Sequence, residues 1–65
     1  MTKAELIKSI DSAIERHGIK PTVFGRRAVG DPSFVFRLRE SGNPTLRTIA
    51  KIQHYITELD QGVTQ

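Results

Sequence analysis

The sequence predicts an all-α fold: a compact bundle of four helices in one small domain. Apolar residues recur at spacings of three and four in the first and last parts of the chain, as they do on the buried face of a helix. Four segments also open on residues that start helices, and few residues join one segment to the next. No segment alternates convincingly like a strand, and the one candidate, Phe34-Val35-Phe36, follows a helix-start signal.

The first helix is expected from about Lys3 to His17. Thr2 and Glu5 fit a capping box, in which each side chain accepts a hydrogen bond from the other residue's backbone N–H. Gly18 suits the turn that ends such a helix. Its apolar face consists of Leu6, Ile7, Ile10, Ala13 and Ile14.

A short second helix is expected from Val23 to about Ala28, with Thr22 as its N-cap. Lys20 precedes a proline, which pushes it toward an extended conformation and places the helix start after it. Val29-Gly30 then breaks the chain.

The third and fourth helices are also predicted from residues that start helices. Asp31-Pro32, an N-cap acid followed by a proline, predicts a helix from Pro32 to about Ser41. Asn43 or Thr45 caps the fourth helix, which ends near Leu59. The predicted core is Leu6, Ile10, Ile14, Ile19, Phe24, Ala28, Val35, Leu38, Leu46, Ile49, Ile52 and Ile56.

Composition narrows the function classes. The chain has 65 residues and no cysteine, so it has no disulfide and no thiolate metal site. Its apolar runs are too short for a transmembrane segment or a signal peptide, and we expect a cytoplasmic protein. His17 and His54 lie far apart without cysteine partners, and no catalytic arrangement or phosphate-binding glycine motif is present. We therefore expect a binding module rather than an enzyme, with no metal and no cofactor.

Positive charge gathers in the middle of the chain. Residues 21–47 contain five arginines and no lysine against Asp31 and Glu40, a net charge of 5 − 2 = +3. The planar guanidinium suits phosphate oxygens and guanine edges. This clustering favours nucleic acid as the partner, with a solvated basic face as the alternative.

The two short helices and the tight turn at Val29-Gly30 outline a helix-turn-helix. Phe24-Gly25 supplies the bulky residue followed by a small one that such a motif needs, because the small residue lets the next helix approach closely. Three further apolar residues lie at offsets that would lock the two helices together: Ala28, Val35 and Leu38.

With these residues, in the segments FGRRAVGDPSFVFRL and RESGNPTLRTIAKI, the chain resembles the lambda-repressor-like helix-turn-helix domains of phage repressors and Cro-like regulators. Gly42, followed by Pro44 and Thr45, looks like the family's turn into its fourth helix. One departure is that the family's turn glycine usually sits one residue earlier, where this chain has Val29. The resemblance implies a sequence-specific double-stranded DNA-binding regulator, a small bacterial or phage repressor that acts by occupying its operator. Residues 1–60 would form this domain and residues 61–65 a flexible polar tail.

In such folds the third helix lies in the major groove, and its outer face reads the bases. Arg37 is expected to bind guanine, Phe36 to contact a thymine methyl group and Ser33 to reach a base or a phosphate. Glu40 would accept from cytosine or pair with Arg37 or Arg39. The alternatives are an ordinary surface or protein-interface role for Phe36 and a solvated charge for Arg37. The expected backbone contacts are Thr22, Arg26, Arg27, Asn43, Thr45 and Arg47.

One small domain contacts too few base pairs to specify a unique DNA site, so a weak homodimer on a palindromic operator is expected. Tyr55 and Leu59, at the edge of the apolar stripe of the fourth helix, are the predicted centre of its interface, while a role for Tyr55 in capping the core is the alternative.

A second function class is a protein-interaction module, such as an antitoxin or adaptor, that binds an acidic protein. RNA binding is less favoured, because the chain has only four aromatic residues and no sheet platform on which bases could stack.

Overall fold

The computed structural model describes residues 2–62, which form four α-helices and no strand. The helices are α1 (Lys3–His17), α2 (Pro21–Val29), α3 (Phe34–Glu40) and α4 (Leu46–Asp60). This confirms the all-α prediction for the described residues. Gln61 and Gly62 form a turn after α4, and the rest of the predicted tail, residues 63–65, lies outside the described residues.

The sequence signals place α1 and α4 correctly. Thr2 and Glu5 form the predicted capping box, with N···O distances of 3.1 and 2.8 Å, and Gly18 ends α1 at a φ of 62°. Thr45, and not Asn43, caps α4: its hydroxyl oxygen accepts a hydrogen bond from the backbone N–H of Thr48 at 3.2 Å.

The predicted start of α2 was wrong by two residues. The helix begins at Pro21, after an extended Lys20, and Thr22 is its second residue and not its N-cap. A proline at the first helical position costs nothing, because its missing N–H has no partner inside the helix in any case.

The third helix is shorter than predicted at both ends. The Asp31 carboxylate accepts a bond from the Ser33 N–H at 2.9 Å, and the Phe34 N–H donates to the Asp31 carbonyl at 3.1 Å. These bonds make residues 31–34 a tight turn before the helix and not its first turn. At the other end, the N–H groups of Ser41 and Gly42 both donate to the carbonyl of Arg37, which closes the helix after Glu40.

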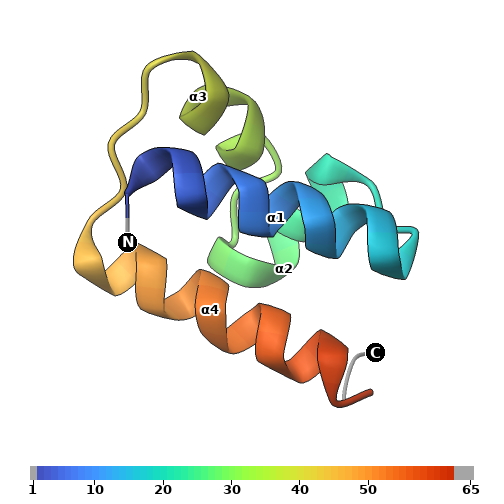
Figure 1. Ribbon diagram of the computed structural model, residues 1–65. Coiled ribbons are helices and arrows are strands. Elements are labelled where there is room, and N and C mark those ends of the chain that lie inside the picture. The colour runs from blue at the N-terminus through green and yellow to red at the C-terminus, as the bar shows by residue number, and fades with distance from the viewer. Residues whose placement is uncertain (1, 63–65) are drawn as a thin grey trace.

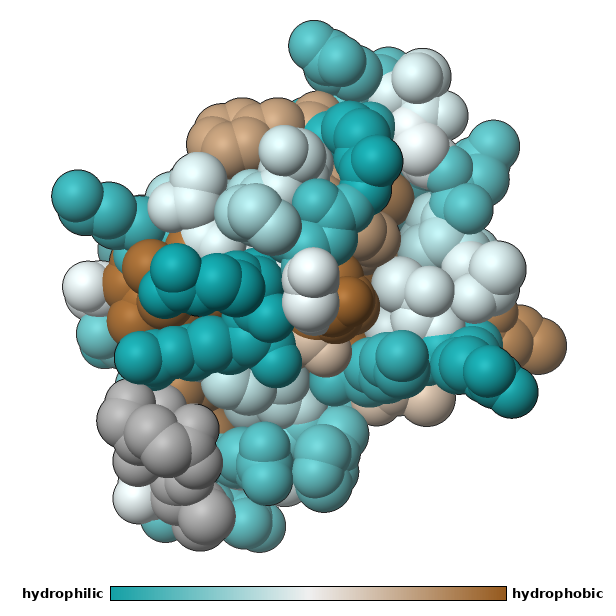
Figure 2. All heavy atoms as spheres, turned by 180° about the vertical axis from the view of Figure 1, so that it is seen from behind, coloured by the Kyte–Doolittle hydropathy of each residue, from teal (hydrophilic) through white to brown (hydrophobic). Residues whose placement is uncertain are grey.

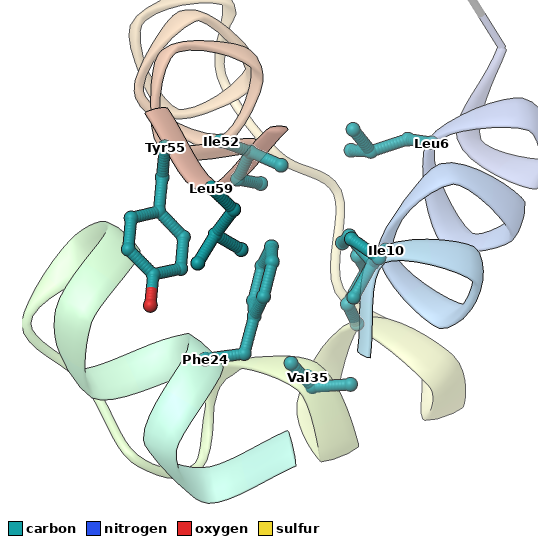
Figure 3. Packing of buried hydrophobic residues seen from close by; sticks show 9 residues of the cluster. Leu6, Ile10, Phe24, Val35, Ile52, Tyr55 and Leu59 are labelled. Atoms are coloured by element: carbon teal, nitrogen blue, oxygen red, sulfur yellow. The ribbon is translucent and has the colours of Figure 1, made fainter. Parts of the chain in front are cut away.

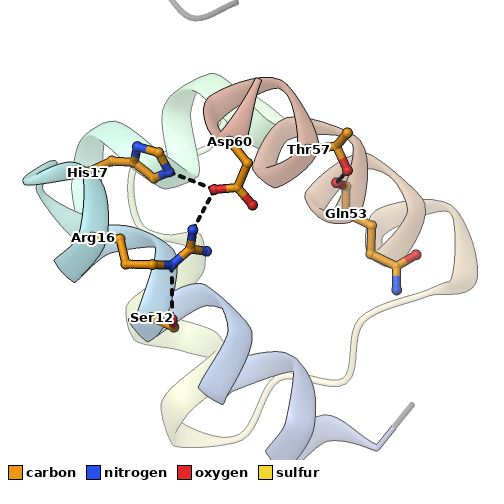
Figure 4. Close-up of polar contacts among 6 residues, drawn as sticks. All are labelled: Ser12, Arg16, His17, Gln53, Thr57 and Asp60. Atoms are coloured by element: carbon orange, nitrogen blue, oxygen red, sulfur yellow. Dashed lines mark hydrogen bonds and ion pairs between the residues drawn. The ribbon is translucent and has the colours of Figure 1, made fainter. Parts of the chain in front are cut away.

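Figure 1 shows α1 across the middle of the molecule with α4 running beside it in the same direction. α2 packs against α3 and α4, and α1 packs against α4. Because α1 and α4 point the same way, their C-terminal ends meet, and there Asp60 accepts from Arg16 at 2.5 Å and lies 2.8 Å from Nε2 of His17 (Figure 4).

The core lies between the helices and is centred on Phe24. This side chain extends from α2 into the space between α1 and α4, and none of it is exposed (Figure 3). The buried residues are Leu6, Ile10, Ala13, Phe24, Val35, Leu38, Ile52, Tyr55 and Leu59. Partly buried apolar residues pack around them, among them Ile14, Ile19, Ala28, Ile49 and Ile56.

Leu46 was wrongly assigned to the core, since its side chain is 84% exposed. At about 100° per residue, Tyr55 and Leu59 lie within about 60° of Ile52 around the helix axis, whereas Leu46 lies about 120° away on the other side. The buried stripe of α4 therefore passes through Tyr55 and Leu59, both of which the core prediction omitted, and leaves Leu46 outside.

Candidate nucleic-acid interface

The close approach between α2 and the start of α3 depends on Gly25. A Cβ atom at this position would lie 2.4 Å from the carbonyl oxygen of Asp31 and 3.4 Å from the Cβ of Phe34. The carbonyl of Gly25 also accepts a hydrogen bond from the Asp31 N–H at 3.1 Å. The expectation that a small residue follows Phe24 to permit close packing is confirmed, and the closest contact is with the turn before α3.

The turn itself uses Gly30 in the left-handed conformation, with a φ of 75°. The N–H of Gly30 donates to the carbonyl of Arg26 at 2.9 Å and so ends α2. Val29, at the position where the resembled family usually has its glycine, is the last residue of α2.

The four residues predicted to read bases lie on one exposed stripe. Phe36, Arg37 and Glu40 share one side of α3, and Ser33, the N-cap residue in the turn before the helix, lies three residues ahead of Phe36. All four are exposed, and 46% of Phe36 is accessible. The opposite side of α3 carries Val35 and Leu38, which are buried. The core therefore holds α3 so that this stripe faces outward.

Two arginines of α3 form ion pairs that the sequence did not indicate. Arg37 pairs with Asp31 in the turn before the helix, and Arg39 pairs with Asp11 on α1 at 2.6 Å. Neither pair involves Glu40, for which pairing with Arg37 or Arg39 was one of two expected roles. Exposed pairs of this kind contribute little to stability.

A groove of about 330 Å³ lies between α3 and the start of α4. Arg37, Glu40, Asn43 and Thr45 all line it, so it brings together two predicted base-reading residues and two predicted backbone contacts. Gly42 lets the chain turn tightly here, because a Cβ at this position would lie 3.1 Å from the carbonyl oxygen of Arg37.

The other predicted contacts do not line this groove. Thr22, Arg26 and Arg27 are exposed on α2, and Arg47 is exposed in the first turn of α4. Arg26 and Arg27 lie in the last turn of α2, where positive charge also suits the helix dipole. Their placement is thus compatible with a phosphate contact and with a purely structural role.

The predicted dimer contacts are in the core. Only 6% of Tyr55 and 3% of Leu59 is exposed. A side chain that is buried within its own chain offers almost no surface to a partner. The prediction that a dimer interface is centred on these two residues was therefore wrong. The alternative for Tyr55, a role in the core, is correct.

The face opposite to that of Figure 1 is mostly hydrophilic, with apolar atoms in small separate patches (Figure 2). Within residues 2–62, no group of three metal-ligating side chains is close enough to hold an ion, and none of the helices has the length and apolar character of a membrane span.

Hydrogen bonds from His17 and Arg16 lower the pKa of Asp60, and the bonds within the capping box lower the pKa of Glu5.

Sequence reasoning missed Asp31 as a member of the candidate interface. The segment Asp31-Pro32-Ser33 does indicate the short-range bond from the Ser33 N–H. The contact with Arg37 spans six residues across a turn and a helix, and no helical spacing rule predicts it.

No protein-family model, curated protein or solved structure matches this chain.

Proposed function

We propose that this chain is a sequence-specific DNA-binding regulator, with α2 and α3 acting as a helix-turn-helix. The observation that carries the proposal is the packing at Gly25, which fixes α3 against α2 and leaves the stripe of Ser33, Phe36, Arg37 and Glu40 exposed. A helix held in this way presents one continuous face, which is what entry into a major groove requires.

The charges near this stripe support the same partner. Arg26 and Arg47 are exposed on the elements that flank α3, and cations at such positions suit phosphates on either side of a groove. The ion pairs of Arg37 and Arg39 reduce the net positive charge around α3. This reduced charge weakens the attraction to phosphates. We therefore expect specific base contacts to contribute a larger share of the binding free energy than the five arginines of residues 21–47 would suggest.

Operator binding as a two-fold pair belongs to the same proposal. A single recognition helix reads a few base pairs, and two copies on half-sites about one helical turn apart read a longer palindrome. Because Tyr55 and Leu59 are buried, the contact between the copies involves other residues.

Selection of bound sequences from random duplex DNA tests the proposal. We expect an enriched, symmetric motif that the protein binds with two copies. If a pair of copies makes roughly 6–10 phosphate contacts, its affinity should fall about 10³–10⁵-fold between 50 and 200 mM salt. Lack of enrichment with a flat salt response would contradict DNA binding. It would favour the protein-interaction alternative, for which the exposed Phe36 and Leu46 supply apolar surface.

A further inference from the structure

Asp31 is bonded at four points in the turn between α2 and α3. Its backbone N–H donates to the carbonyl of Gly25, and its carbonyl accepts from the N–H of Phe34, each at 3.1 Å. Its side-chain Oδ1 accepts from the backbone N–H of Ser33 at 2.9 Å, and its Oδ2 pairs with Nη2 of Arg37. One carboxylate thus contacts two of the four residues on the exposed stripe.

In the pair with Arg37, Asp31 is the fixed partner. Its backbone is held on both sides and its other carboxylate oxygen is occupied, whereas Arg37 has a long side chain that is 63% exposed. The position of the guanidinium is therefore set by the carboxylate. The contact at Nη2 leaves most of the five guanidinium N–H donors available to a further ligand.

The charge of Asp31 also changes what Arg37 can bind favourably. A carboxylate beside the guanidinium neutralises its charge and repels a nearby phosphate. The edge of a guanine offers neutral acceptors, O6 and N7, which a positioned guanidinium can contact in bidentate fashion without this repulsion. The pair therefore disfavours phosphate more than it disfavours a base.

We infer that Asp31 is a positioning and specificity-determining residue: it holds Arg37 for a base edge and suppresses the contacts of Arg37 with phosphate. This inference rests on the proposed DNA-binding function. It goes beyond that function by assigning a role to an acidic residue that makes no DNA contact of its own.

Asp31→Asn tests the inference, since the amide oxygen still accepts from the Ser33 N–H while the ion pair with Arg37 is lost. Asp11→Asn is the matched control: it makes the same change in net charge and breaks the other ion pair of an α3 arginine, that between Arg39 and Asp11 of α1. The affinity of each variant is measured for the selected duplex, for its single-base variants and for an unrelated duplex, over a range of salt concentrations. Circular dichroism checks that each variant is folded.

We expect Asp31→Asn to bind the unrelated duplex more tightly than the wild type, with a salt slope steeper by about one. Discrimination at one base pair should fall by about fivefold or more, the lower end of what a bidentate arginine contact supplies. Asp11→Asn should retain the wild-type discrimination. Combining Asp31→Asn with Arg37→Ala should give the discrimination of Arg37→Ala alone, because Asp31 acts through Arg37.

Equal effects of Asp31→Asn and Asp11→Asn would overturn the inference, as would unchanged discrimination in Asp31→Asn or additive losses in the double variant. If Asp31→Asn does not fold, Asp31→Ser replaces it, since its hydroxyl can still accept in the turn. Failure of both to fold would assign Asp31 a structural role and overturn the inference. A wild-type protein that does not discriminate among duplexes would instead refute the proposed function, which separates the two failures.

Discussion

The ring of Tyr55 on α4 meets the ring of Phe24 on α2 edge to face, with centroids 5.2 Å apart and an angle of 73° between the planes. This arrangement places the positive edge of one ring against the negative face of the other, which is favourable beyond the area that it buries. It joins α2, which leads into the turn before α3, to the buried face of α4 (Figure 3). The hydroxyl of Tyr55 is buried and has no hydrogen-bond partner among residues 2–62.

We therefore expect Tyr55→Phe to leave the free energy of unfolding unchanged or to raise it by about 1 kcal/mol. The substitution keeps the ring contact and removes a polar atom whose burial is not compensated by a hydrogen bond. Tyr55→Ala, in contrast, should lower the free energy of unfolding by about 3–5 kcal/mol, close to all that a domain of this size has. Urea denaturation followed by circular dichroism measures both. A clear loss of stability in Tyr55→Phe would show that the hydroxyl has a partner.

Gly25→Ala is expected to destabilise the fold, although the same change inside an open helix normally stabilises it. The new methyl group would lie 2.4 Å from a backbone carbonyl oxygen, that of Asp31, which is itself held by hydrogen bonds. Forced overpacking of this kind costs about 1–3 kcal/mol. The thermal midpoint should fall, and DNA binding should weaken with it because α3 moves relative to α2. A midpoint at or above that of the wild type would show that the close packing at Gly25 is not needed.

The sequence predicted the long helices and most of the core because these depend on local signals. The capping box at Thr2 and the hydroxyl of Thr45 satisfy N–H groups within one turn, so they can be found without knowing the fold. Phe24 and Gly25 were interpreted correctly for a similar reason, since a bulky residue beside a small one indicates a tight packing point.

The errors concern features that depend on neighbours far along the chain. The orientation of α4 is set by the direction from which α1 and α2 approach, and it places Tyr55 in the core and Leu46 in solvent. The partners of Arg37 and Arg39 lie in a turn and on another helix, so helical spacing does not indicate them. The candidate site was therefore predictable as a set of exposed residues, while their mutual contacts were not.

Asp60 should make the stability of the fold depend on pH in the acid range. Its hydrogen bonds with His17 and Arg16 lower its pKa below the ordinary value of 3.8. A carboxyl group whose pKa is lowered by folding stabilises the folded state above its unfolded pKa, and this contribution disappears as the pH falls through the lowered value. Asp60→Asn should therefore melt below the wild type at pH 7, and the difference between the two midpoints should shrink as the pH falls below the ordinary pKa of 3.8.

Two further variants control for general acid effects on the same midpoints. Arg16→Gln removes one donor to Asp60, so its difference from the wild type should also shrink at low pH. Arg26→Gln, on α2 and without a contact to Asp60, should differ from the wild type by the same amount at every pH. A difference between Asp60→Asn and the wild type that does not shrink as the pH falls would show that the carboxylate charge is not the cause.

Arg37→Ala and Arg47→Ala should weaken DNA binding in different ways. Arg37 lies on the exposed stripe of α3 and is held by Asp31, so its loss should remove discrimination at one base pair, at a cost of about 1–3 kcal/mol. Arg47 is exposed in the first turn of α4, where a cation is unfavourable to the helix dipole and adds nothing to stability. Its loss should therefore weaken binding to all duplexes about equally and reduce the salt slope by about one, without lowering the thermal midpoint.

Lys8→Ala, at an exposed position on α1, is the matched loss of charge and should change neither the discrimination nor the salt slope. Binding assays on a panel of single-base operator variants measure these effects, and a uniform loss of affinity in both arginine variants would contradict the assignment of Arg37 to base reading.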